Sequence, residues 1–380
     1  MLQLSKNSEK SQEINSIIFL AEKLREKFLY SESLKLFEKA LKACKMMNDH
    51  QTYFKCAISS GDILRMLGKF NRAAERYNEA LTIAKKLRDL TKVADAKIGL
   101  GLSFRAQGKW KDTLKLLKES EIIYRRKNDI EGIAFLKWAE GGTLRIKGDI
   151  TNSIRSYKKS LKMFKAIGDR AGSGYCLCGL GGASRVSGKY INSLRFYTEA
   201  NKLFLTLKDT FGKAYSYCGI GNAYRLMNDF KNSSKYFKKA MRLYKKIGDK
   251  VSYAYTLWGF GILYLMIGQY LKASEYLKMA LSFFKLTNDP RGIIYCELGF
   301  GQIALLKCKN NSAKNLFLAA ERKSKRYNFA LEKCHVRLLL NYLNSIYFRK
   351  DQKLIFKTNK KCYNVLGVKI EFQGLPFNIP

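Results

Sequence analysis

The sequence predicts an all-α, right-handed solenoid of about eight helix–turn–helix repeats, and three observations carry that prediction. Glycine recurs every forty residues, at Gly61, Gly101, Gly141, Gly181, Gly221, Gly261 and Gly301. Aspartate keeps the same period, at Asp49, Asp89, Asp129, Asp169, Asp209, Asp249 and Asp289. Only three prolines occur in 380 residues, so nearly the whole chain is free to be helical. Such a period indicates one unit stacked on copies of itself.

Each unit divides into two helices. In the unit 210–249 we expect helices over about 212–227 and 230–246, separated by a turn at Asn228 and Asp229. Residues that enter left-handed conformations cheaply end the first helix of each unit, at Gly68, Gly108, Gly148, Gly188, Asn228 and Gly268. We call residues at the same position of successive repeats a column. The aspartate column follows the second helices, so we predict that these aspartates are N-caps of the next first helices rather than catalytic carboxylates. Pro290 after Asp289 fits the first position of a helix.

The packing positions of this unit carry a family resemblance. Its first helix presents Tyr217, Ile220, Gly221 and Tyr224, and its second presents Ser233, Phe237 and Ala240. This pattern resembles the tetratricopeptide repeat. The period of forty instead of thirty-four, and the missing proline after the second helix, are similar to the long-helix variety of cell-polarity adaptors and bacterial peptide-sensing receptors. The resemblance implies a binding scaffold whose first helices line a concave surface.

The resemblance sets the expected boundaries. We expect an N-terminal tail over 1–9, eight repeats over 10–329, a capping helix over 330–350 and an extended tail over 351–380. Val368, Ile370 and Phe372 alternate with polar residues, which is typical of a strand. Two roles stay open for this tail: it covers the end of the solenoid, or it occupies the groove as a self-ligand.

One face of each first helix is predicted to line the groove. At 100° per residue, Tyr215, Asn222 and Arg225 fall within an arc of about 100°, opposite the packing residues. In the other repeats the same columns hold arginine, aromatic residues and finally leucine. The candidate groove residues are Arg65, Arg105, Arg145, Arg185, Arg225, Trp138, Tyr175, Tyr215, Asn222, Tyr255, Trp258, Leu265, Tyr295 and Leu305.

The arginine column suggests the ligand. With helices about 10 Å apart, the arginines would span roughly 50 Å, enough for an extended peptide of about 15 residues. Leu265 and Leu305 would then provide an apolar anchor at the end. Alternatively, the arginines pair with acids of neighbouring repeats or merely keep the face solvated.

The net charge of the chain limits the classes of partner that it can attract. The chain has 71 Lys and Arg against 31 Asp and Glu, a formal net charge of +40, which attracts acidic proteins, nucleic acid or anionic membrane surfaces. The leading hypothesis is an adaptor that binds an acidic, extended protein segment, since guanidinium groups bind carboxylates bidentately. Two alternatives are binding of RNA or another polyanion and a regulatory subunit that senses a peptide.

Other functions find little support in the sequence. The two histidines, His50 and His335, lack metal-binding spacing, and Gly-x-Gly recurs within helices rather than in a dinucleotide loop. We therefore expect no enzyme, no metal and no cofactor.

The uncharged stretch 251–271 is long enough to span a bilayer, but its register with the other repeats favours a core helix. The nine cysteines form no CxxC pair, which favours a reduced, cytoplasmic protein.

Overall fold

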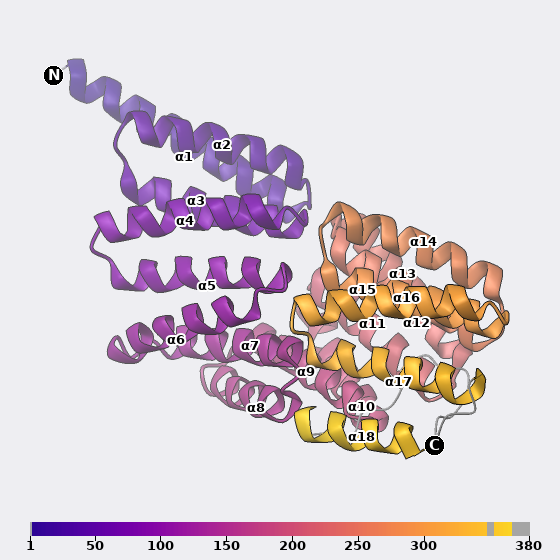
Figure 1. Ribbon diagram of the computed structural model, residues 1–380. Helices are drawn as coiled ribbons and strands as arrows, with labels where there is room; N and C mark the ends of the chain where they lie inside the picture. The colour runs from indigo at the N-terminus through magenta and orange to yellow at the C-terminus, as the bar shows by residue number, and fades with distance from the viewer. Residues whose placement is uncertain (1, 348–352, 367–380) are drawn as a thin grey trace.

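The computed structural model describes residues 2–347 and 353–366, and these residues form helices joined by short turns. Figure 1 shows the helices stacked in chain order as antiparallel pairs. Helices α1 to α16 make eight pairs, followed by α17 and α18. Their bounds are α1 Leu2–Glu26, α2 Tyr30–Met46, α3 His50–Met66, α4 Phe70–Lys86, α5 Leu90–Ala106, α6 Trp110–Arg126, α7 Ile130–Lys147, α8 Ile150–Ala166, α9 Arg170–Val186, α10 Tyr190–Thr206, α11 Thr210–Leu226, α12 Phe230–Ile247, α13 Lys250–Met266, α14 Tyr270–Leu286, α15 Pro290–Leu306, α16 Asn310–Arg326, α17 Ala330–Tyr347 and α18 Lys353–Leu366.

The aspartate column caps the first helices, as the sequence predicts. Asp49 accepts a hydrogen bond from the backbone N–H of Thr52 at 3.0 Å. At the start of α15, Asp289 accepts from the N–H groups of Arg291 and Gly292, both at 3.0 Å, with Pro290 in the first turn. A carboxylate in this place satisfies N–H groups that have no partner inside the helix.

The turn column also adopts the predicted conformation. Gly148 has φ 96° and Asn228 has φ 61°, both in the left-handed region. Glycine pays no Cβ penalty there, and asparagine tolerates the region better than most residues. These residues end the first helices and fix the angle between the two helices of each pair.

A second set of glycines brings consecutive repeats close together. The helical positions Gly99, Gly179 and Gly219 lie against Tyr77, Tyr157 and Tyr197 of the preceding second helix. A Cβ atom on Gly219 would stand 2.1 Å from the Tyr197 ring. The Gly-x-Gly recurrence therefore serves helix packing.

The chain ends differ from the sequence-based expectation. Residues expected as an N-terminal tail are helical, because α1 begins at Leu2. Part of the expected extended C-terminal tail is also helical: α18 covers Lys353–Leu366, and its Cys362 and Leu366 are buried against α8, α9 and α17. A local pattern does not show this docking. Residues 367–380, including Val368, Ile370 and Phe372, lie outside the described residues.

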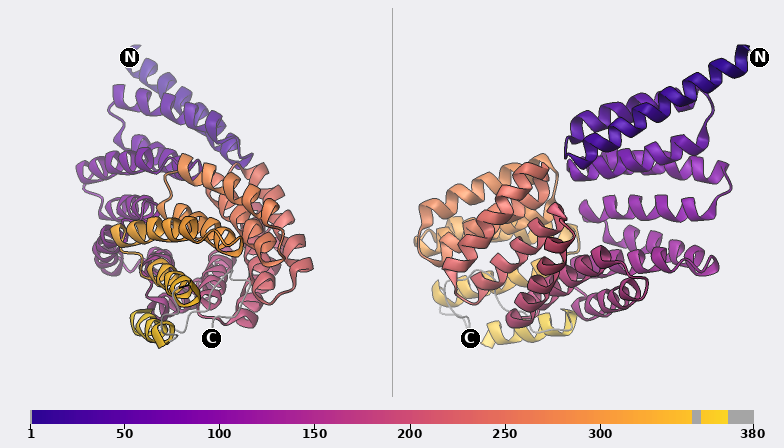
Figure 2. Two further views of the ribbon diagram at one scale, coloured as in Figure 1. Left: turned by 45° about the vertical axis from the view of Figure 1, so that its right-hand side comes forward. Right: turned by 180° about the vertical axis from the view of Figure 1, so that it is seen from behind.

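The superhelix is tight enough for its successive turns to touch. Trp110 Nε1 at the start of α6 donates a hydrogen bond to the carbonyl of Tyr327, 217 residues later, at 3.3 Å. Gly108 also contacts Tyr327 and Phe329, and Gly68 contacts Thr287. The chain thus meets itself after between five and six repeats, and α17 lies against α7. Figure 2 shows the orange and yellow helices of the last repeats beside the purple and magenta helices of earlier repeats, while α1 and α18 lie at opposite ends of the molecule.

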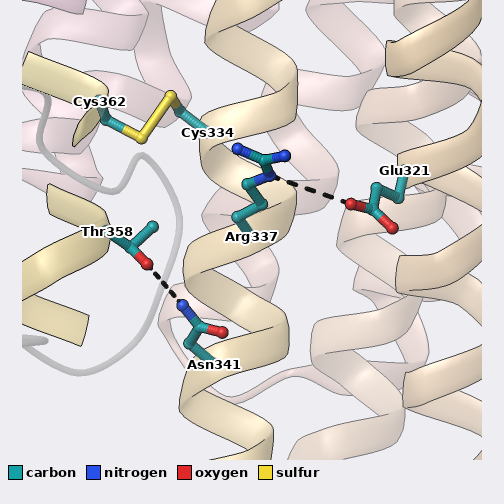
Figure 3. The surroundings of a disulfide bond; sticks show 6 residues. All are labelled: Glu321, Cys334, Arg337, Asn341, Thr358 and Cys362. Carbon is teal, nitrogen blue, oxygen red and sulfur yellow. Dashed lines mark hydrogen bonds and ion pairs between the residues drawn. A yellow bond between two sulfur atoms is a disulfide. The ribbon is translucent and has the colours of Figure 1, made fainter. Parts of the chain in front are cut away.

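A disulfide joins the last two helices. Cys334 in α17 and Cys362 in α18 are bonded, with their Cα atoms 5.8 Å apart (Figure 3). Asn341 Nδ2 donates to Thr358 Oγ1 at 2.7 Å between the same helices. The expectation that the cysteines are reduced is therefore wrong for this pair. The free cysteines Cys44, Cys56, Cys176, Cys178 and Cys296 are buried, which agrees with a packing role.

No helix of the described residues combines the length and the apolarity that a membrane crossing requires. The stretch 251–271 belongs to α13, the turn and the start of α14. It is apolar because α13 packs inside the solenoid, where Leu257, Phe260 and Ile262 are buried.

Candidate binding cavity

A cavity of ≈ 330 Å³ lies inside the superhelix. First helices from α5 to α15 surround it, and the turn-to-turn contact through Phe329 closes one side. Its size is at the lower end of ligand pockets, which run from about 300 to 1,000 Å³. Nine of the fourteen predicted groove residues line it: Arg105, Arg145, Arg185, Trp138, Tyr215, Asn222, Tyr255, Trp258 and Tyr295.

The geometry contradicts the expected open groove of 50 Å. Successive first helices curl around one axis instead of lying side by side on a shallow surface, so their arginines converge. The per-repeat rotation that brings the turns into contact is the reason. An extended segment of fifteen residues does not fit a cavity of this volume.

Arg105 shows how each arginine crosses to the next repeat. Its guanidinium lies over the Trp138 ring, 5.6 Å from the centroid, and Nη1 donates to the carbonyl of Ala139 at 3.4 Å. Gly142 leaves the room, because a Cβ atom there would stand 2.6 Å from Arg105 Nη1. Tryptophan is the best aromatic face for a cation.

Two of the four arginines that line the cavity have no acidic partner among the described residues. Among the described residues, no ion pair involves Arg105 or Arg145. Nε of Arg145 is buried without a hydrogen-bond partner. Buried charges are normally paired, so this arrangement is costly without an anion.

Burial and mutual repulsion act on these groups together. Burial lowers the pKa of Arg105 to about 10, and the positive charges of Arg65 and Arg145 contribute to the shift. The guanidinium stays protonated at neutral pH. The lining contains four arginines and one acid, Asp289, whose carboxylate already caps α15. The cavity therefore favours an anionic ligand.

An ion-pair network that the sequence did not reveal borders the cavity. Arg291 Nε lies 2.5 Å from Glu332 Oε1, and Tyr295 Oη donates to the same oxygen at 2.7 Å. Glu332 belongs to α17 and is fully buried. Neither Arg291 nor Glu332 stands in a repeating column, so no periodic signal marks them. They tie α15 and its Tyr295 to the capping helix.

Tyr157 and Tyr197 are two further lining residues that the sequence argument missed. Both belong to second helices and occupy the packing column of Phe237, so they were assigned to the core alone. They reach the cavity because Gly179 and Gly219 let each ring slide beneath the next first helix.

Three predicted residues lie outside the cavity lining and have structural partners. Arg65 forms an ion pair with Asp62 at 3.1 Å. Arg225 is fully buried, donates to Asn222 Oδ1 at 3.2 Å and covers the Trp258 ring at 5.7 Å. Tyr175 Oη donates to the capping residue Asp209 at 2.8 Å. These side chains stabilise the walls.

The expected apolar anchor is wrong. Leu265 is 0% exposed and Leu305 is 5% exposed, and both belong to core clusters rather than to the cavity. Their column faces the packing interface between successive first helices, which we call the seam. A leucine ends inside that seam, whereas the longer side chains of Arg105, Arg145 and Arg185 extend beyond it to the cavity.

The sequence and structure comparisons agree on the architecture. A family model described as the tetratricopeptide repeat matches residues 212–285, from α11 to α14. Residues 212–285 are tetratricopeptide repeats. A comparison with curated protein sequences finds no match for the chain.

Solved structures extend the likeness to most of this tetratricopeptide-repeat protein. A Rap protein complexed with competence and sporulation factor has a TM-score of 0.67 and 14% identity, covering 93% of this chain and 99% of that chain. The Rap conjugation gene regulator of plasmid pLS20, in complex with the Phr* peptide, has a TM-score of 0.63 and 13% identity over 82% and 96%.

A third structure adds an enzyme to the comparison. Aspartyl phosphate phosphatase F from Bacillus subtilis has a TM-score of 0.53 and 13% identity, covering 94% of this chain and 96% of that chain. At these identities the likeness shows a shared fold.

Proposed function

We propose that this tetratricopeptide-repeat protein is a regulatory protein that senses a short acidic peptide in its central cavity. The observation that carries the proposal is the excess of arginine over acid in a cavity with aromatic walls. The similar Rap regulator, solved in complex with the Phr* peptide, supports a peptide rather than a metabolite. This assignment replaces an adaptor for a long extended segment, because the cavity holds only a few residues.

The side chains that line the cavity indicate the chemistry of the ligand. A guanidinium presents several N–H donors in a planar fork that matches a carboxylate. Trp138, Trp258 and Tyr255 supply flat apolar surface with a polar edge, the side chains that dominate compact binding sites. An acidic peptide would neutralise the charges of Arg105 and Arg145.

The test is titration calorimetry with pentapeptides in matched pairs, one containing glutamate and the other glutamine at the same positions. We expect binding of the acidic member only, and a 10- to 100-fold weaker affinity in Arg145→Gln, because a hydrogen bond to a charged group contributes about 1.5–3 kcal/mol. Arg65→Gln is the control, since Asp62 already occupies that guanidinium. Equal affinity for both peptides, or an unchanged affinity in Arg145→Gln, would reject the cavity as the site.

The absence of enzymatic activity stays a prediction. The fold shared with aspartyl phosphate phosphatase F makes acyl phosphate hydrolysis the activity to assay. Release of phosphate from acetyl phosphate above the rate of the buffer would contradict the prediction.

A further inference from the structure

The outer face of the middle repeats carries an unbalanced positive charge. Residues 151–290 contain 24 Lys and Arg against 7 Asp and Glu. Five of the seven acids are helix caps, at Asp169, Asp209, Asp229, Asp249 and Asp289. No ion pair among the described residues joins two residues of this segment, whereas residues 1–150 contain twelve such pairs. The ion pairs of later residues do not involve this segment either, so its exposed basic side chains have no ion pair among the described residues.

The charge is concentrated on α12. Seven basic side chains of this helix are exposed, and the helix contains no acid. At 100° per residue they fall within an arc of about 120°, and they follow the helix for about 22 Å. We call this set the basic ridge: Lys231, Lys235, Lys238, Lys239, Arg242, Lys245 and Lys246.

Neighbouring second helices continue the basic ridge in the same columns. The exposed basic residues of α8 stand eighty residues before their counterparts in α12, at Arg155, Lys158, Lys159, Lys162 and Lys165. Helix α10 adds Arg195 and Lys202, and α14 adds Lys278 and Lys285. Because first helices of successive repeats contact one another on the inside, the second helices form the convex side.

We propose that this convex face binds single-stranded nucleic acid through its phosphates. A flexible polyanion can follow the curvature and meet several helices in turn. A flat bilayer would touch about one helix, and a duplex, with a persistence length of about 150 bp, is too stiff to follow the curve. At one edge, Lys239 lies 5.2 Å from the half-buried rings of Tyr217 and Tyr236, which provide surfaces for base stacking.

The proposal predicts a defined salt dependence. Each neutralised phosphate of a single strand contributes about −0.7 to the slope of log affinity against log salt. Contact with the seven charges of the basic ridge therefore gives a slope of about −5. Fluorescence polarisation of a labelled 20-nucleotide oligouridine, titrated with the full chain at several NaCl concentrations, measures this slope.

A pair of charge-matched variants makes the test specific. The ridge variant carries Lys235→Gln, Lys239→Gln, Arg242→Gln and Lys245→Gln, and its slope should fall by about 3. The control variant carries Lys35→Gln, Lys39→Gln, Lys42→Gln and Lys45→Gln, in the same columns of the first repeat. Those lysines share α2 with Glu32 and Glu38. Both variants lose four charges, and both should keep the helical circular dichroism and melting midpoint of the wild type.

Each outcome of this experiment either supports or overturns nucleic-acid binding by the convex face. A loss of affinity for oligouridine that is confined to the ridge variant supports binding at the convex face. Equal losses in both variants, or no binding at physiological salt, overturn it. Vesicles containing 30% anionic lipid form a third arm, and ridge-dependent binding to them but not to oligouridine would assign the face to a membrane surface instead. The basic ridge does not line the cavity, so these results are independent of the peptide titration.

Discussion

At the residue scale, small side chains set the spacing of this solenoid as much as large ones. Gly99, Gly179 and Gly219 each accept an aromatic ring from the preceding repeat, and Gly142 accepts the guanidinium of Arg105. A side chain at these glycines would overlap the tyrosine rings and the guanidinium of Arg105. The same residue type therefore controls both packing and the composition of the candidate site.

Gly219→Ala should destabilise the protein by about 1–3 kcal/mol, because the added methyl group overlaps the buried ring of Tyr197. Gly101→Ala is the matched control, since its nearest neighbour would be Thr113 at an ordinary 3.5 Å. Alanine is the better helix former by roughly 0.5–1 kcal/mol, so the control should be neutral or stabilised. Thermal unfolding by circular dichroism measures both variants, and equal losses would contradict the packing argument.

At the element scale, α18 depends on tertiary contacts. Its apolar side packs on Ile150 and Ala183, and the Cys334–Cys362 disulfide ties it to α17. The helix in turn covers Leu331 and Leu338 of the capping helix. It is a second cap, which an end repeat of a solenoid requires for solubility.

Replacing both Cys334 and Cys362 with serine should loosen α18. Closing a loop of 28 residues is worth about 3–4 kcal/mol in the chain-entropy view. We expect faster amide hydrogen exchange in residues 353–366, with the exchange of α3 to α12 unchanged. Cys308→Ser, at an exposed free cysteine, is the control. Unchanged exchange in α18 would show that packing alone holds it.

At the scale of the whole molecule, contact between turns converts an open groove into a cavity. Three contacts align along the superhelix: Gly68 with Thr287, Gly108 with Phe329, and Gly148 with Leu366. Each joins a turn of the first half to a turn or helix of the second half. Entry of a ligand therefore depends on how these contacts open.

Trp110→Ala should separate the turns, because it removes the hydrogen bond to Tyr327 and the ring packed beside it. We expect a larger radius of gyration by small-angle X-ray scattering and a loss of about 2 kcal/mol. Tyr270→Ala is the control at the same repeat position, next to Gly268, which has nothing within 4 Å of its Cβ position. Superimposable scattering curves for wild type and Trp110→Ala would contradict the closure.

Much of the site was predictable at the level of columns. Helical periodicity placed Arg105, Tyr215 and Trp258 on the inner face, where the structure has them. The same logic failed for Leu265 because a column records direction, not depth: Leu265 and the longer Arg225 of the same column are both fully buried. Tyr157 was missed because its column looked purely structural. Binding of a peptide in the cavity and of nucleic acid on the convex face are proposals for all the residues named.

The repeating sequence by itself determined the helices, their caps, their turns and the order of their stacking, because these depend on residues at most a few turns apart. Only the tertiary structure decided that the solenoid closes on itself, that α18 docks beside α8, and that Glu332 neutralises Arg291. Those features arise from a small rotation repeated at each unit, which accumulates over 217 residues. No pattern within one repeat encodes this accumulated rotation, and the central cavity is its consequence.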